Sequence, residues 1–261
     1  APVFTSIAGA ALIMLWGEQV PVASLAVDHY GMVINPSLPT IPMFTLAGYL
    51  LAESRSPQRL INVFHALFGQ FRGGAAIVAV LACTFFTSFT GASGVTILAL
   101  GGLIMPLLLR SGYAEKQALG LITAGGSPGV MLMPAVPLIL YAIVADISIE
   151  DMFLGGVLPV ILFVIMISGY AASKQREQPS HEFDKLEAIA AIRAAKWELM
   201  LPAIPIGALF SGLATPVETA ALTAFYAFIV VTFVHKDLSV KNDLPRVMSE
   251  CGLLVGGILL I

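Results

Sequence analysis

The chain has 261 residues, of which 58% are hydrophobic and only 11% are charged, and its net charge is -3. Soluble domains carry charge on about 25% of their residues, so this composition excludes a soluble domain and predicts an all-α polytopic membrane protein. The cysteines Cys83 and Cys251 lie far apart in apolar segments, where we expect small buried side chains rather than a disulfide or a metal site.

The placement of basic residues predicts how the chain crosses the membrane. All 13 Lys and Arg residues fall into four clusters, which the positive-inside rule assigns to the cytoplasm: residues 55–72, 110–116, 174–196 and 236–246. Segments 17–36 and 146–151 contain acids but no Lys or Arg, so we expect them on the external side. The apolar segments connect these sides consistently: 1–16 outward, 37–53 inward, 73–109 from the inside and back to it, 117–145 outward, 152–171 inward, 197–213 outward, 217–234 inward and 251 onward outward.

Two polar segments are expected outside the hydrocarbon core. Residues 54–72 interleave basic and apolar side chains at helical spacing, which predicts an amphipathic helix along the cytoplasmic surface. Residues 172–196 are the most charged segment, and we expect a solvated connector there that is partly helical from Phe183 to Lys196.

Between Arg72 and Arg110 lie 37 uncharged residues, with the small, hydroxyl-containing turn 89–94 near their middle. At about 1.5 Å per residue, each apolar arm reaches roughly 25 Å, less than the roughly 30 Å of the hydrocarbon core. Because both arginines are expected in the cytoplasm, the segment predicts a re-entrant helical hairpin. Non-helical backbone at such depth requires surrounding protein or water, which indicates a binding site at the turn.

Residues 117–145 form an apolar run that seven glycines and prolines interrupt between Gly120 and Pro137. Proline lacks an amide donor and glycine weakens a helix, so we expect a broken transmembrane helix, with the break between Gly125 and Pro134. A broken helix presents free carbonyls that favour a cation and free amides that favour an anion. A kink that only shapes packing is the alternative.

The hairpin turn and the break together predict a site for Na⁺. No ionisable side chain lies at mid-depth of a predicted span, and Glu218 is expected in the first turn of its helix, so a proton relay is poorly supported. Sodium held by neutral oxygens fits better, with Ser88, Thr90, Ser93 and Ser127 as candidates; each hydroxyl could instead bond to its own helix backbone. No nucleotide-binding glycine motif or converging catalytic set is present in the sequence, so we expect no enzyme.

The segment Pro2–Thr5 resembles the segment Pro216–Thr219. The first begins a span predicted to run outward and the second a span predicted to run inward, as an inverted-topology repeat requires. We therefore expect the start of a second, truncated repeat over residues 197–261, with a second hairpin beyond Ile261, so that the chain is a fragment.

Motifs spread over most of the chain carry a resemblance to a known family: Ile41–Gly48, Phe85-Phe86, Thr90–Thr96, Gly101, Pro106, Gly112-Tyr113, Gly125–Gly129, Pro134 and Thr215–Glu218. In these residues the chain resembles the large membrane subunit of TRAP (tripartite ATP-independent periplasmic) transporters. The resemblance implies sodium-driven import of small organic acids, such as C4-dicarboxylates or sialic and sugar acids, across a bacterial inner membrane. It also implies two partners, a periplasmic substrate-binding protein and a small four-helix membrane subunit.

The resemblance further implies an inverted-repeat elevator-type fold. Residues 1–72 would be scaffold helices and an arm helix, 73–145 part of the moving transport domain, 146–196 a connecting span and linker, and 197–234 further scaffold. The family's sodium sites, carried over, point to Thr90, Gly91, Ser93, Gly126, Ser127 and Gly129, and the substrate would lie beside Thr96, Gly125 and Pro134. The chain departs from the family where Met133-Pro134-Ala135 replaces a common Pro-Pro-Ser run and Pro128 a common leucine, which removes any ligand role at Ala135.

Two other functions fit the same sequence. One is an elevator-type carrier of the citrate or divalent-anion class that works without a binding protein. The other is a channel or a structural membrane scaffold in which residues 73–109 form two ordinary spans.

Overall fold

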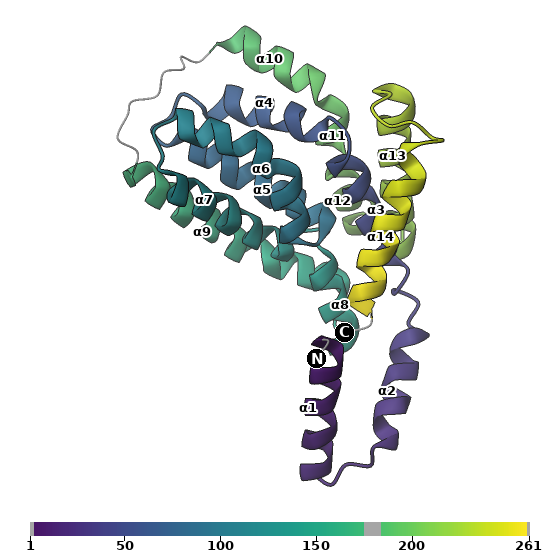
Figure 1. Cartoon of the computed structure of the whole chain (residues 1–261). Helices are drawn as coiled ribbons and strands as arrows, with labels where there is room; N and C mark the ends of the chain where they lie inside the picture. The colour runs from purple at the N-terminus through teal and green to yellow at the C-terminus, as the bar shows by residue number, and fades with distance from the viewer. Residues whose placement is uncertain (1–2, 175–183, 260–261) are drawn as a thin grey trace.

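The computed structural model describes residues 3–174 and 184–259, and the regular structure in these ranges is helical throughout (Figure 1). The elements, in chain order, are α1 (Val3–Gly17), α2 (Ala23–Val33), α3 (Thr40–Ala52), α4 (Ser56–Phe68), α5 (Gly74–Thr90), α6 (Ser93–Arg110), α7 (Glu115–Gly126), the 3-10 turn η1 (Ser127–Met131), α8 (Val136–Ala145), α9 (Ile149–Lys174), α10 (Lys185–Ala194), α11 (Lys196–Met200), α12 (Ala203–Phe210), α13 (Pro216–Ile229), the π-helical segment η2 (Val230–Val234) and α14 (Asp243–Leu259).

Four helical stretches among the described residues are long and apolar enough to cross a membrane: 93–110, 115–145, 149–174 and 216–234. Three shorter apolar helices accompany them, at Thr5–Gly17, Thr40–Ala52 and Gly74–Thr90. The prediction of an all-α polytopic membrane protein is therefore confirmed. Cys83 and Cys251 are buried free thiols, as expected from their apolar surroundings.

The helices form two groups, with further helices above them (Figure 1). Helices α5, α6, α7 and α9 lie on the left of the view, and α3, α12, α13 and α14 lie on the right. Helices α4 and α10 and the connection between α13 and α14 lie at the top, while the connection between α8 and α9 lies toward the bottom. The predicted cytoplasmic and external segments thus occupy different ends of the molecule.

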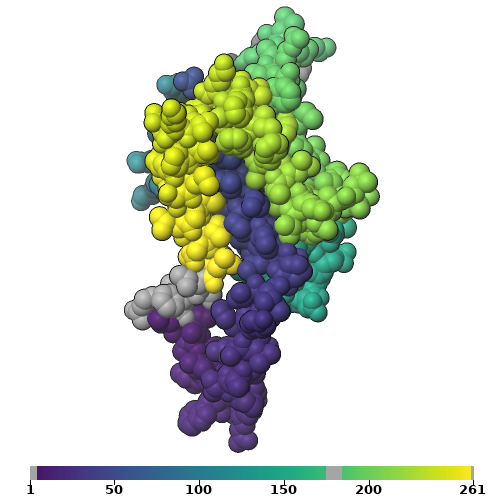
Figure 2. All heavy atoms as spheres, turned by 90° about the vertical axis from the view of Figure 1, so that its right-hand side faces the viewer, coloured from purple at the N-terminus to yellow at the C-terminus, as the bar shows by residue number. Residues whose placement is uncertain are grey.

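Helices α1 and α2 form an antiparallel pair that extends downward from the other helices (Figures 1 and 2). Helix α2 lies within the predicted external segment 17–36, whose charge pattern gave no sign of a helix. Its side chains Val27 and Tyr30 are exposed. Charge placement reports the side of the membrane and not the backbone conformation, so the helix was missed.

The predicted span 197–213 is divided into α11 and α12, with a gap at residues 201 and 202. Pro202 and Pro205 have no amide hydrogen, which removes helical hydrogen bonds at this point. The helix predicted from Phe183 to Lys196 is present as α10, and Phe183 itself lies outside the described residues.

Helix α3 belongs to the right-hand group and also packs against the left-hand one. It contacts α13 and α14 on one side and α5 on the other, and Figure 2 shows it between α12 and α14 on the right-hand face of the molecule. A Cβ atom at Gly48 would lie 2.5 Å from the carbonyl carbon of Phe89 and 2.6 Å from the amide nitrogen of Thr90. Only glycine therefore allows α3 to approach the end of α5 this closely.

The amphipathic helix predicted within residues 54–72 is α4, which buries Leu60, Ile61 and Val63 and exposes Gln58 and Asn62. Its position along the membrane surface stays a prediction. The buried face packs on α5, and α10 packs on α4.

Arg59 links α4 to two segments far along the chain. Its Nε atom donates a hydrogen bond to Glu198 in α11, and its Nη2 atom donates to Asp237 after η2. The Glu198 carboxylate is fully buried; it also accepts a hydrogen bond from Ser56 at 3.2 Å, and His235 Nε2 lies 3.4 Å from it. Burial lowers the pKa of Arg59, but the hydrogen bonds to Asp237 and Glu198 outweigh burial and raise the pKa above its ordinary value, so the guanidinium stays charged.

Replacing Glu198 with Gln is expected to lower the free energy of unfolding by about 1.5–3 kcal/mol, because a buried charge-assisted hydrogen bond becomes a neutral one. The measurement is the thermal unfolding midpoint of the purified full-length protein in detergent. Glu250→Gln is the matched control, since the Arg246–Glu250 pair is exposed and is expected to contribute less than about 1 kcal/mol. Equal losses in both variants would contradict a structural role for the buried pair.

Candidate cation site

The uncharged segment between Arg72 and Arg110 consists of α5 and α6 joined by two residues. Gly91 follows α5 with a φ of 68°, the left-handed conformation that ends a helix and that glycine adopts without strain. Ala92 is extended, and α6 begins at Ser93. The predicted helical hairpin is therefore confirmed, whereas its re-entrant position in the membrane stays a prediction.

Three threonine hydroxyls meet at the closed end of this hairpin. Thr87 Oγ1 donates to Thr96 Oγ1 at 2.8 Å, and Thr90 Oγ1 lies 3.2 Å from the same Thr96 atom. Thr90 Oγ1 also donates to the main-chain oxygen of Ala92 at 3.3 Å. All three threonines are buried, so the hairpin end holds a cluster of neutral oxygens that are removed from solvent.

Thr87 is absent from the residues predicted for the site. Threonine occurs at positions 84, 87 and 90, and residues three apart lie along the same side of a helix. This spacing is the signal that could have identified Thr87, but the prediction rested on the turn and not on the helix leading into it.

The apolar run 117–145 breaks where its glycines and prolines predicted. Helix α7 ends at Gly126, η1 follows it, and α8 starts only at Val136. Pro134 is in the non-helical part and follows a cis peptide bond. The interruption agrees with the predicted interval 125–134, and it leaves a helix end on each side.

The hairpin end packs directly against this break. Thr84 Oγ1 donates to the main-chain oxygen of Gly125 at 3.0 Å. A Cβ atom at Gly129 would overlap the Thr84 carbonyl oxygen and would lie 2.5 Å from Thr87 Cβ. A Cβ atom at Gly91 would lie 2.8 Å from Val136 Cβ at the start of α8. Two segments that are about forty residues apart in the chain thus meet through backbone surfaces that carry no side chains.

The predicted serine ligands differ in their surroundings. Ser88 is buried and donates to the Phe85 carbonyl at 2.7 Å. Ser93 is half-buried, and a Cβ atom added at Gly126 would lie 3.4 Å from the Ser93 Cβ atom. Ser127 is exposed, and its hydroxyl lies 3.4 Å from the Thr123 carbonyl oxygen. Ser88 and Ser127 therefore make the local backbone hydrogen bonds that were the alternative for each hydroxyl, while Ser93 lies where hairpin and break meet.

Glu218 is held at the start of α13. Its Oε2 atom accepts a hydrogen bond from the Thr215 amide at 2.8 Å, and Thr215 Oγ1 accepts one from the Glu218 amide at 3.3 Å. This reciprocal arrangement caps the first turn of the helix. The predicted first-turn role of Glu218 is confirmed.

The family model described as "Tripartite ATP-independent periplasmic transporter, DctM component" matches residues 1–261, the whole of the chain. The chain belongs to this family. The DctM family consists of permease components of transporters and not of enzymes. Its members are integral proteins of the inner membrane, in agreement with the apolar helices of this chain.

Several curated relatives share about 30% or slightly more of their aligned residues with this member of the DctM family. The C4-dicarboxylate TRAP transporter large permease protein DctM of Pseudomonas aeruginosa is 33% identical over 251 residues, which cover 95% of this chain and 58% of the relative. The protein of the same name in Vibrio cholerae is 31% identical over 236 residues, with coverages of 89% and 52%. The ectoine/5-hydroxyectoine TRAP transporter large permease protein UehC of Ruegeria pomeroyi is 30% identical over 253 residues, with coverages of 95% and 59%. The chain therefore spans somewhat more than half the length of these relatives.

Replacing Gly129 with Ala is expected to lower the free energy of unfolding by about 1–3 kcal/mol, because overpacking against Thr84 and Thr87 forces the hairpin and the break apart. The measurement is the thermal unfolding midpoint of the full-length permease in detergent. Gly101→Ala in α6 is the matched control, since a Cβ atom there meets nothing within 4 Å. Equal midpoints in the two variants would contradict the close contact at Gly129.

Proposed function

We propose that this protein is the large permease subunit of a sodium-coupled, binding-protein-dependent TRAP transporter that imports small organic acids. The observation that carries the proposal is the buried threonine cluster at the hairpin end, which packs against the break between α7 and α8. Secondary transporters hold coupling ions at interrupted helices through free backbone carbonyls and helix C-terminal ends, and the hydroxyl cluster lies beside such an interruption.

Oxygen ligands for sodium would come from both elements. The hairpin would supply the hydroxyl oxygens of Ser88, Thr90 and Ser93 and the carbonyl oxygen of Gly91. The break would supply the carbonyl oxygens of Gly126 and Gly129 and the hydroxyl oxygen of Ser127. The last carbonyls of a helix have no intrahelical partners, and the partial negative charge at this end favours a cation. Each hydroxyl oxygen has two lone pairs, so Thr90 can contact a cation while it keeps its hydrogen bond to Ala92.

Replacing Thr90 with Val removes a hydroxyl while it nearly preserves the size of the side chain. We expect the sodium concentration for half-maximal uptake to rise about tenfold, which corresponds to about 1.4 kcal/mol of binding free energy. Ser93→Ala and Ser127→Ala should shift the sodium dependence in the same direction. The measurement is substrate uptake into proteoliposomes at varied sodium concentration.

The control for this experiment is Thr223→Val. Thr223 is also a buried threonine, but its hydroxyl donates to the Thr219 carbonyl within α13 at 2.7 Å. Its replacement should leave the sodium dependence unchanged. A Thr90 variant with wild-type sodium dependence would remove this side chain from the proposed site.

The proposed transport movement is an elevator in which residues 73–145 move against scaffold residues 1–16 and 197–234. The contact between α3 and the hairpin supports a boundary that can slide. At Gly48 the backbone of α3 faces the backbone of Phe89 and Thr90 without a side chain between them. Interlocking side chains would have to separate before such a movement. Two backbone surfaces without a side chain between them can move past each other without that separation.

The substrate is proposed to be a small organic acid that lies beside Thr96, Gly125 and Pro134. The start of α8, next to the break, presents amide groups and the positive end of a helix dipole, which favour a carboxylate. Relatives named for C4-dicarboxylates in Vibrio cholerae and Pseudomonas aeruginosa support this substrate class. Relatives named for isethionate and ectoine show that the family serves several solutes.

The proposed partners are a periplasmic substrate-binding protein and a small membrane subunit. Proteoliposomes that contain the complete permease and the small subunit should accumulate substrate only when the binding protein is added on the external side. Uptake that needs no binding protein would instead indicate a carrier of the citrate or divalent-anion class. Buffer containing a binding protein of unrelated specificity is the control.

A further inference from the structure

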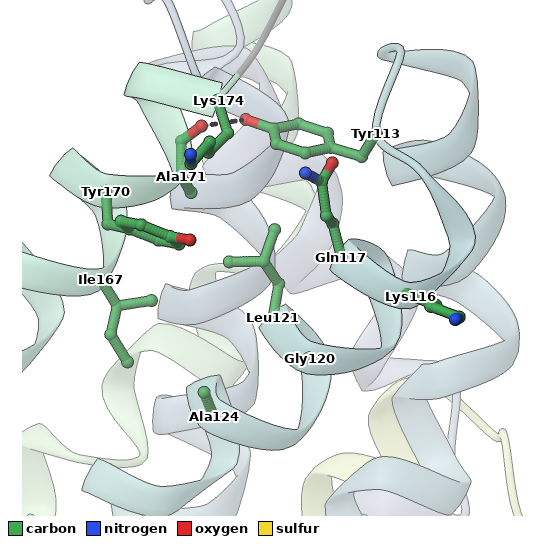
Figure 3. A pocket seen from close by; sticks show the side chains of 10 residues that line it. All are labelled: Tyr113, Lys116, Gln117, Gly120, Leu121, Ala124, Ile167, Tyr170, Ala171 and Lys174. Carbon is green, nitrogen blue, oxygen red and sulfur yellow. Dashed lines mark hydrogen bonds between the residues drawn. The ribbon is translucent and has the colours of Figure 1, made fainter.

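A cavity of about 400 Å³ lies between α7 and α9, and none of its lining residues belongs to the candidate cation site (Figure 3). Tyr113, just before α7, lines its polar end. The Tyr113 hydroxyl donates to the Ala171 carbonyl at 3.1 Å. Burial raises the pKa of Tyr113, so the hydroxyl keeps its proton and fixes the start of α7 to the end of α9.

The cavity is polar at one end and apolar at the other. Along α9 the lining runs from Lys174 through Tyr170 to Ile167, and along α7 it runs from Gln117 to Ala124. Seven residues of helix separate the two ends on each side, a distance of about 10 Å. The cavity therefore has a polar mouth and an apolar interior that follow the direction of the membrane-length helices.

The mouth of the cavity is basic. Lys174 is the last residue of α9, and its amino group lies over the Tyr170 ring, 5.6 Å from the ring centre, while the Gln117 amide and the Tyr170 hydroxyl point into the space between the helices (Figure 3). Lys116 also lines the cavity, although its amino group points away from this space in the same view. No acidic residue is among the described lining residues, and Glu115, the nearest acid in sequence, is not one of them.

Gly120 keeps the middle of the cavity open. Gly120 lies inside α7, where the backbone is in the ordinary helical conformation that any residue can adopt. A Cβ atom there would meet nothing within 4 Å. Neither the backbone nor the packing requires glycine at this position, although glycine costs about 1 kcal/mol relative to alanine in a helix. Gly120 therefore contributes to the cavity by leaving its middle free of a side chain.

We propose that this cavity binds an anionic phospholipid of the cytoplasmic leaflet, with its phosphate at Lys174 and Gln117 and an acyl chain along Leu121 and Ile167. Basic pockets between transmembrane helices on the cytoplasmic side suit anionic headgroups, and the membrane surface there is negatively charged. A soluble anion would use the polar mouth but would leave the apolar interior unfilled. The inference rests on the membrane location of the family and is independent of sodium coupling.

The test is native mass spectrometry of the detergent-purified, full-length permease titrated with phosphatidylglycerol or phosphatidylcholine. The wild-type protein should retain one phosphatidylglycerol more tightly than phosphatidylcholine. Lys174→Gln should weaken that binding about fivefold, the factor for about 1 kcal/mol per basic residue. Lys116→Gln should have a smaller effect, and Lys241→Gln, an exposed lysine in the connection between α13 and α14, should have none.

Two further variants fill the cavity without changing its charge. Gly120→Phe and Ala124→Leu should each abolish the tight phosphatidylglycerol adduct while the unfolding midpoint in lipid-free detergent stays near that of the wild type. If one of them misfolds, the other still tests the apolar interior. Equal lipid retention in all variants, no tight adduct in the wild type, or displacement of the lipid by millimolar inorganic phosphate would each overturn the proposal. Sodium-dependent uptake is not needed for any of these measurements, so they succeed or fail separately from the transport proposal.

Discussion

The close approach of the hairpin end to the interrupted helix is the contact on which the rest of the site depends. At Gly129 and Gly91 the missing side chains let backbone meet backbone or the base of a neighbouring side chain. Dense interiors tolerate little added volume, so these two glycines determine the position of the hairpin end relative to the break between α7 and α8. One result is that Thr87, Thr90 and Thr96 are buried together, with their hydroxyls hydrogen-bonded to one another and to the Ala92 carbonyl.

A second contact network holds the ends of the helices in place. Arg59 joins α4 to Glu198 and Asp237, which lie about 140 and 180 residues further along the chain. Burying such charges is costly unless each has a partner, and here the arginine has two. The amphipathic helix α4 is thereby tied to the second group of helices at one end and packed on the hairpin along its length.

The chemistry of the two proposed binding sites agrees with their predicted depth in the membrane. In the hydrocarbon region a charged side chain is expensive, so a site there is built from hydroxyl groups and backbone oxygens such as those at Thr90 and Gly126. At the membrane surface a long cationic side chain can keep its charge in the polar layer while its stem lies against apolar groups. Lys174 at the end of α9 lies in a segment predicted to be cytoplasmic, and the lining of the cavity beyond it includes the apolar residues Leu121, Ala124 and Ile167.

The sequence by itself determined the class of protein, the hairpin between Arg72 and Arg110 and the interruption between Gly125 and Pro134. These features follow from local chemistry: uncharged length, glycine flexibility and the missing proline amide. Only the tertiary structure decided that Thr84 meets Gly125, that Ser127 is exposed, and that Arg59 meets Glu198. Such pairings depend on which faces pack together and on which glycines permit the approach, and no spacing along the chain specifies contacts between residues so far apart.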